Sequence, residues 1–171
     1  IKDYGYKYAT LSGLTLGLYD IEIPEERPLI IEEADKEALE AEKQFRRGLI
    51  TKQEKEARLV EIWSGAMGKM SKIVSGNYDT FNPIKMMSES GSRGSSAQIN
   101  QLSGMRGLMS STSGKLIEVP VRSCFKKGLS VIEYFISTRG GRKGLVDKAL
   151  KTADSGYLTR RLVDIAQDVV I

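Results

Sequence analysis

The segment "ALKTADSGYLTRRLVD", residues 149–164, combines small residues with clustered cations in a pattern that suits a nucleic acid. Thr152, Ala153 and Gly156 stand at positions i, i+1 and i+4, which share one side of a helix. Positive charge around such a smooth surface would neutralise phosphates while a base rests against the backbone. Close packing of another protein element is the alternative. The cations near this patch are Arg142, Lys143, Lys151, Arg160 and Arg161.

A second candidate site is the run "SGSRGSS", residues 90–96. Glycines that precede a helix let backbone N–H groups approach an anion, and Arg93 would add a positive charge. The run matches neither the P-loop nor the dinucleotide-binding pattern. Phosphate binding and an ordinary capped turn therefore both remain open.

The patch at residues 152–156 requires a long helix to carry it. Leu158, Leu162, Ile165 and Val169 recur at helical intervals, and the pattern predicts a helix over residues 128–167. Four glycines interrupt it, and each costs about 1 kcal/mol relative to alanine. Periodicity alone would also allow two helices that divide at "RGGRKG", residues 139–144.

Two further helices should form an antiparallel hairpin. Prolines at 24 and 28 mark the start of a helix over residues 29–47, and Thr51 can cap a second helix over about residues 52–74. The turn "GLIT" joins them. Apolar Phe45, Leu49 and Ile50 stand at this tip, so it is either a docking site or a solvated turn.

The remaining segments complete a mostly α fold. Asn82 and Ser95 predict short helices, residues 111–121 a loop with a short strand, and residues 1–28 a short helix end followed by extended or β segments. The predicted units are residues 1–28, 29–80, 81–124 and 125–171. Together they form a helical hairpin (coiled coil), short helices, a small β element and one long glycine-containing helix, which is not a self-contained globular fold.

Composition excludes several classes of site. The chain has 171 residues, a net charge of +4, no histidine and one cysteine, Cys124. Histidine-based triads, His-ligated metals and internal disulfides are therefore excluded, and we expect no metal site in this span. We expect a reducing intracellular compartment and no membrane span, since no run approaches the roughly 20 apolar residues required. Ile1 stands where a methionine would start a complete protein, so we expect a piece of something longer.

Charge is distributed unevenly along the chain. Residues 24–61 hold eleven acidic and eight basic residues, whereas residues 139–161 hold seven basic and two acidic ones. The hairpin and the long helix should therefore face different partners.

A family resemblance covers essentially the whole chain. The stretches "NPIKMMSESGSRGSSAQINQLSGMRGLM" and "GLSVIEYFISTRGGRKGLVDKALKTADSGYLTRRLVDIAQDVV" closely resemble the β′ subunit of bacterial DNA-directed RNA polymerase. The N-terminal "KYATLSGLTLGLYDIEIPEERP" and the hairpin resemble it in the same order. Arg139 and Gly141 depart from the histidine and alanine usual in that family, and the connection after the hairpin is short compared with some members.

For the hairpin and the short helices, the resemblance implies a place at the secondary channel. Residues 29–74 would be the rim helices, where transcript-cleavage and other secondary-channel factors dock through Phe45, Arg46, Arg47 and Leu49. Residues 82–103 would line the channel through which nucleoside triphosphates enter. Arg93 would meet the nucleotide's phosphates, and "GMRGLMSSTSG" would be a flexible loop under the long helix.

For the long helix, the resemblance implies the bridge helix, which crosses the cleft and bends during translocation. Thr152, Ala153, Gly156 and Tyr157 would lie against the template base pair. Arg142, Lys143, Lys151 and Arg160 would lie near the template DNA or the RNA–DNA hybrid. The implied partners are the β, α, ω and σ subunits, and the implied location is the cytoplasm.

The resemblance implies an enzyme whose metal site lies outside this span. Nucleotidyl transfer needs carboxylates that hold two Mg²⁺ ions, and the family's Asp-Phe-Asp-Gly-Asp motif is absent here. Asp147, Asp154, Asp164 and Asp168 are spread along a helix. We therefore predict no catalytic residue and no polymerase activity for the isolated piece. The alternatives are a free-standing hairpin interaction module and a small basic nucleic-acid-binding protein.

Overall fold

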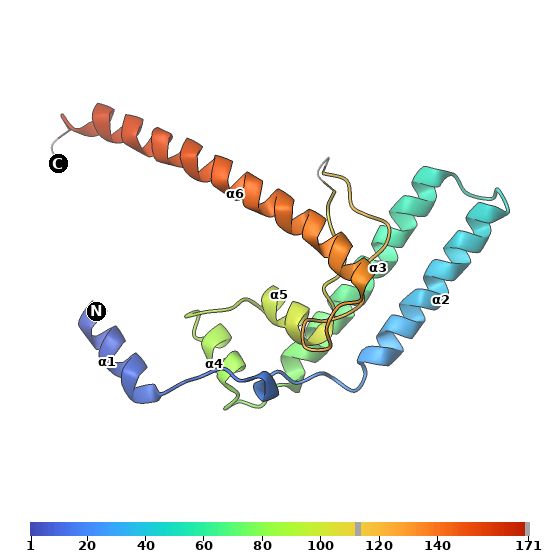
Figure 1. The fold of residues 1–171 in the computed structure, drawn as a ribbon, viewed down its shortest axis with the longest axis horizontal. Coiled ribbons are helices and arrows are strands. Elements are labelled where there is room, and N and C mark those ends of the chain that lie inside the picture. Colours follow the sequence, from blue (N-terminus) through green and yellow to red (C-terminus); the bar gives the residue numbers. More distant parts are fainter. Residues whose placement is uncertain (112–113, 170–171) are drawn as a thin grey trace.

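The computed structural model describes residues 1–111 and 114–169, and within them the predicted mostly α class is confirmed. Six α-helices are present in these ranges, and two short turns of other helix types accompany them: the 3₁₀ turn η1 (Leu18–Asp20) and the π-helical turn η2 (Asn100–Gly104). The α-helices are α1 (Lys2–Ser12), α2 (Arg27–Arg46), α3 (Lys52–Asn77), α4 (Pro83–Glu89), α5 (Ser96–Ile99) and α6 (Val131–Ala166). Figure 1 shows α2 and α3 side by side and α6 extending away from them.

The predicted hairpin is confirmed, and local chemistry explains both of its helices. Pro28 stands in the first turn of α2, where its missing N–H costs nothing. Thr51 caps α3: its hydroxyl accepts from the N–H of Glu54, whose carboxylate accepts from the N–H of Thr51. Small Ala34 and Ala41 are buried on α2, so α3 can pack closely against it.

The core lies at the base of the hairpin, where the later segments cross it. Trp63 and Met70 of α3 are 1% and 0% exposed. Met105 and Val121, which follow η2 along the chain, are also fully buried there. The hairpin is therefore stabilised at its base by burial against segments that are distant in sequence.

The lead-in is more helical than predicted. Residues 1–28 were expected to hold only a short helix end before extended segments, but α1 occupies Lys2–Ser12. Tyr4 and Tyr8, one turn apart, stack with ring centroids 6.5 Å apart, which favours the helix. Gly13 ends it in the left-handed conformation with φ of 58°. Alternation of apolar and polar residues was therefore misleading here.

The predicted strand near residues 115–121 is wrong for the part that the structure describes. Only two isolated antiparallel bridges form, between Gly107 and Val121 and between Ser110 and Leu116. Two residues separate the paired positions on one side and four on the other, so the register shifts between the bridges. Pro120 lies in the longer stretch and has no N–H to donate. Thr112 and Ser113 of the predicted loop lie outside the described residues.

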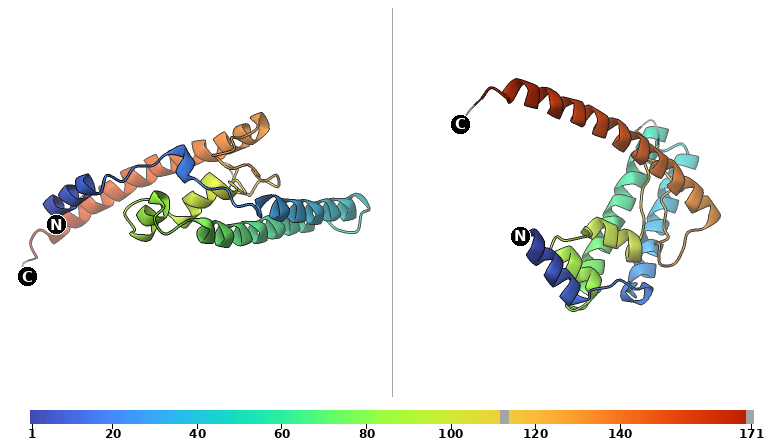
Figure 2. Two further views of the ribbon diagram at one scale, coloured as in Figure 1. Left: turned by 90° about the horizontal axis from the view of Figure 1, so that it is seen from below. Right: turned by 60° about the vertical axis from the view of Figure 1, so that its left-hand side comes forward.

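The long helix is confirmed as one continuous element. α6 runs for 36 residues through all four of its glycines, so the alternative of two helices is wrong. Ser130 caps it, and Ser137 is its single buried residue. Figures 1 and 2 show it projecting beyond the other elements. The last two residues of the predicted unit 125–171 are not described. No helix in the described ranges is both long and apolar enough to cross a membrane.

Candidate nucleic-acid interface

A shallow trough runs along the exposed side of α6. Small residues form its floor, because Thr152, Ser155, Gly156 and Thr159 recur at helical intervals. The Thr152 hydroxyl donates to the carbonyl of Lys148 at 2.7 Å, and the Thr159 hydroxyl donates to that of Ser155 at 2.8 Å. Both hydroxyls thus bond the helix itself. The full lining is Gly144, Asp147, Lys148, Lys151, Thr152, Ser155, Gly156 and Thr159.

Gly156 has no packing reason within residues 1–111 and 114–169. A Cβ at this position would meet nothing within 4 Å, and the same holds for Gly141 and Gly144. Gly140 differs, because a Cβ there would collide with the Sδ-methyl end of Met109. Contact with the loop that carries Met109 therefore explains Gly140. Gly156 costs the helix about 1 kcal/mol, and no neighbour in the described residues offsets that cost.

The trough only partly coincides with the predicted patch. Of the predicted residues, Lys151, Thr152 and Gly156 line it. Ala153, Tyr157 and Arg160 are exposed on the adjoining side of α6, and the Arg161 guanidinium lies 5.6 Å from the Tyr157 ring centre. Sequence reasoning missed Ser155 and Thr159, although their helical spacing from Thr152 was a usable signal.

The two cations at the start of the predicted patch differ in their contacts. Arg142 is exposed. Lys143 is half-buried, and its Nζ donates to the carbonyl of Ser111 at 3.2 Å. Lys143 is therefore engaged by the loop beside α6, which leaves Arg142 as the freer of the two for a ligand.

Arg93 lies on a different part of the molecule from the α6 patch. It lines a cavity of about 400 Å³ between α4, η2 and the lead-in, together with Leu16, Met87, Leu102 and Phe125 among others. Its N–H donates to the carbonyl of Met87 at 3.2 Å, and Ser95 caps α5 by accepting from Gln98. The geometry within the chain is that of a capped turn with an exposed arginine.

The hairpin tip leaves its predicted docking residues accessible to different degrees. Leu49 is 70% exposed, whereas Phe45 is 36% exposed and lies under the ammonium of Lys55, 5.0 Å from the ring centre. Arg46 pairs with Glu42 at 2.8 Å, and Arg47 follows as the exposed C-cap of α2. The tip therefore presents one bare apolar side chain beside two cations.

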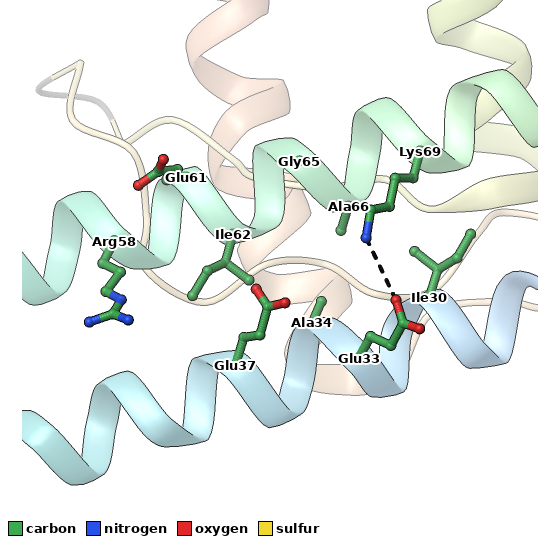
Figure 3. A pocket seen from close by; sticks show the side chains of 10 residues that line it. All are labelled: Ile30, Glu33, Ala34, Glu37, Arg58, Glu61, Ile62, Gly65, Ala66 and Lys69. Atoms are coloured by element: carbon green, nitrogen blue, oxygen red, sulfur yellow. Dashed lines mark ion pairs between the residues drawn. The ribbon is translucent and has the colours of Figure 1, made fainter.

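A groove of about 330 Å³ lies between α2 and α3 (Figure 3). Arg58 and Lys69 point from α3 toward α2, and Lys69 pairs with Glu33 at 3.6 Å. Its lining is Ile30, Glu33, Ala34, Glu37, Arg58, Glu61, Ile62, Gly65, Ala66 and Lys69. Charges of both signs frame a floor of small and aliphatic residues, which distinguishes this face from the basic side of α6.

The first turn of α6 is anchored by Glu133. Its carboxylate accepts from the N–H groups of Arg122, Ser123 and Ser130, each at 3.0 Å, and from the Ser123 hydroxyl at 2.8 Å. Burial opposes ionisation, but these hydrogen bonds outweigh it and lower the pKa of Glu133 to about 2. Ser130 was not predicted as a cap, although its spacing from Glu133 is that of a capping box, and the bonds from Arg122 and Ser123 were not predicted either.

Acidic side chains do not gather into a metal site in the described ranges. Asp147, Asp154 and Asp164 are spread along α6, and a helix of this length separates them by several turns. These residues do not fit a two-metal centre, so no chemical step can be derived through one here.

Comparison with known families identifies both halves of the chain. The family described as RNA polymerase Rpb1, domain 4, matches residues 34–140, and Rpb1, domain 5, matches residues 128–171. The DNA-directed RNA polymerase subunit β′ of Chloroflexus aggregans is 54% identical over all 171 residues. Those of Shouchella clausii and Natranaerobius thermophilus are 55% and 53% identical over the same length. The chain spans 11% of the first relative and 14% of the other two.

Proposed function

Because the chain belongs to the bacterial RNA polymerase β′ family, as a segment that covers Rpb1 domains 4 and 5, we propose that α6 is the bridge helix and supports the template during RNA synthesis. In this proposal the trough and its adjoining face receive the template base pair. Thr152, Ala153, Gly156 and Tyr157 form the bearing surface. Arg142, Lys151 and Arg160 lie toward the phosphates of the template or the RNA–DNA hybrid, and Lys143 joins them if it releases Ser111.

The observation that carries this proposal is Gly156. The helix bears the cost of a glycine at a position where nothing in the described chain comes close. Gly141 is equally bare, but Gly156 lies in the trough beside Ser155 and one turn from Thr152, whereas Gly141 does not line it. A surface that approaches from outside explains this residue, and the surrounding cations favour a polyanion. The hydroxyls of Thr152 and Thr159 are bonded to the helix backbone, so the same surface presents methyl groups to a flat base.

The remaining roles concern entry of substrate and docking of factors. Arg93 lies at the rim of a cavity beside the proposed channel-lining helices α4 and α5, where it would meet the phosphates of entering nucleoside triphosphates. The hairpin tip would dock secondary-channel factors through Leu49, Phe45, Arg46 and Arg47. The β, α, ω and σ subunits would assemble around the parent subunit, whose catalytic Mg²⁺ would be held by residues beyond this segment.

The central test adds a side chain to the bare surface. Gly156→Leu improves helix propensity, and a Cβ at this position meets no atom of the described chain within 4 Å, so α6 should remain folded. Against a template base, however, overpacking typically costs about 1–3 kcal/mol, which corresponds to a fall in rate of roughly 5- to 150-fold. The measurement is single-nucleotide addition by reconstituted polymerase that carries the substitution.

Gly141→Leu is the matched control, because a Cβ there also meets nothing within 4 Å on the same helix, but Gly141 does not line the trough. It should slow nucleotide addition far less than Gly156→Leu. Equal effects of the two substitutions, or wild-type addition by Gly156→Leu, would refute the bearing surface.

A further inference from the structure

Arg27 is a buried cation at the base of the hairpin. It is the first residue of α2 and is 5% exposed. Its Nε donates to the carbonyl of Gly104 at 2.7 Å, and its Nη2 donates to the carbonyl of Arg122 at 2.9 Å. Across the described residues no ion pair involves it. A buried charge is costly unless it is hydrogen-bonded, so these two carbonyls fix the position of its side chain.

The same stretch of backbone is held from the opposite side by α6. The carbonyl of Arg122 accepts from Arg27, whereas the N–H groups of Arg122 and Ser123 donate to Glu133. Glu133 also accepts from Ser130 at the start of α6. Two side chains of opposite charge, from α2 and from α6, thus bind one short piece of chain.

The stretch between them is well held. The carbonyl of Ser123 accepts from the N–H of Arg106 at 3.1 Å, and the N–H of Phe125 donates to the carbonyl of Gln101 in η2, also at 3.1 Å. Val121 and Cys124 are fully buried. Because the stretch is packed and hydrogen-bonded, it can transmit the position of α2 to α6.

We infer that Arg27 is a positioning residue for α6: it holds the Arg122–Ser123 backbone from the hairpin while Glu133 holds it from the helix. The contacts of Gly140 with Met109 and of Lys143 with Ser111 come from the loop that this stretch closes. Lysine cannot replace Arg27, because it lacks the two forked donors that reach separate carbonyls. The consequence for RNA synthesis rests on the proposed function of α6, whereas the clamp itself does not.

The length of α6 explains why its first turn matters. Gly156 is 25 residues beyond Val131, the first residue of the helix, or about 38 Å along the axis at 1.5 Å per residue. A tilt of about 5° at the first turn would move Gly156 by about 3 Å. The proposed bearing surface would leave its working position after a displacement of that size.

The test follows hydrogen exchange in reconstituted polymerase whose β′ subunit carries Arg27→Lys, Glu133→Gln or both. In Arg27→Lys, the amides of residues 134–137 at the start of α6 should exchange about tenfold faster, because a charge-assisted hydrogen bond is lost. The double variant should exchange no faster than the faster single variant, since both substitutions release the same stretch. Arg58→Lys, which alters an exposed hydrogen bond to Gln44, is the matched control and should leave these amides unchanged.

Unchanged α6 exchange in Arg27→Lys, or additive effects in the double variant, would overturn the inference. If Arg27→Lys prevents assembly, Ser123→Ala is the second variant, because it removes only the 2.8 Å hydroxyl bond to Glu133. It should speed exchange at the amides of residues 134–137, and unchanged exchange at those amides would equally overturn the inference. Faster exchange with wild-type nucleotide addition would support the clamp and refute the proposed role of α6. The two proposals therefore fail separately.

Discussion

The base of the hairpin and the long helix α6 use their apolar residues in opposite ways. At the base, Trp63, Met70 and Met105 are buried in one hydrophobic cluster. In α6, large apolar residues such as Leu150, Leu158 and Leu162 are more than half exposed, and only Ser137 is buried. One region thus obtains its stability from its own chain, whereas the other is presented to surroundings that lie outside it.

The largest expected effect concerns the buried base of the hairpin, compared with the exposed side chains of α6. Trp63→Ala should lower the free energy of unfolding of the chain by about 3–5 kcal/mol, because it empties a fully buried site. Leu158→Ala should change it by no more than about 0.5 kcal/mol, because Leu158 is 56% exposed on a helix that tolerates either residue. Urea unfolding followed by far-ultraviolet circular dichroism measures both. Similar losses for the two variants would show that α6 is packed as tightly as the core.

A smaller effect concerns the junction between the two regions and depends on pH. The pKa of Glu133 is lowered from 4.5 to about 2 in the folded chain. Its stabilisation is therefore fully present above pH 4.5 and is lost as the pH falls toward 2. Hydrogen exchange at residues 134–137 should accelerate over this range, after correction for intrinsic exchange, while exchange in α3 changes less.

Glu133→Gln supplies the control for this pH effect. The variant should resemble the acid form already at neutral pH and lose the additional pH dependence of the α6 amides. A variant whose amides keep the wild-type pH profile would show that another group controls the junction.

The smallest expected effect concerns the far end of the hairpin. Reversing charge with Arg46→Glu and Arg47→Glu should weaken binding of a secondary-channel factor by about 1 kcal/mol, or about fivefold. The effect is small because each exposed charge contributes little to the free energy of binding. A titration of reconstituted polymerase with a transcript-cleavage factor measures this. Glu42→Gln, which removes only the partner of Arg46, is the control. Unchanged affinity in the charge-reversed variant would remove the tip from the docking surface.

Much of the fold was predictable from the sequence because helix ends are local. Thr51, Asn82, Ser95 and Ser130 bond N–H groups two or three residues away, so their roles can be inferred from short stretches. The hairpin followed from such signals together with apolar periodicity, whereas the long helix followed from apolar periodicity alone. The family membership was likewise accessible, since it is carried by contiguous motifs that the comparisons match over the full chain.

Errors arose where local signals competed with one another. Alternation in residues 1–28 suggested extended chain, but stacking of Tyr4 on Tyr8 accompanies a helix there. Residues 117–119 include types that favour β-strands and so suggested a strand, but a register shift beside Pro120 leaves only isolated bridges in the described residues. In the candidate interface, helical spacing placed Thr152 and Gly156 on one side of the helix but did not separate the trough from the adjoining face.

The sequence by itself determined the hairpin, the capped short helices and the long helix, and to which family the chain belongs, but not the helix at Lys2–Ser12. Only the tertiary structure decided that Arg27 binds carbonyls 77 and 95 positions away and that Lys143 donates to Ser111. It also decided that Met109 occupies the space beside Gly140, whereas the space beside Gly156 is open in the described residues. The physical reason is the separation in sequence between the interacting groups. A helix cap bonds residues within one turn of chain, whereas the surroundings of a buried cation or of an exposed glycine are set by segments that are distant in sequence.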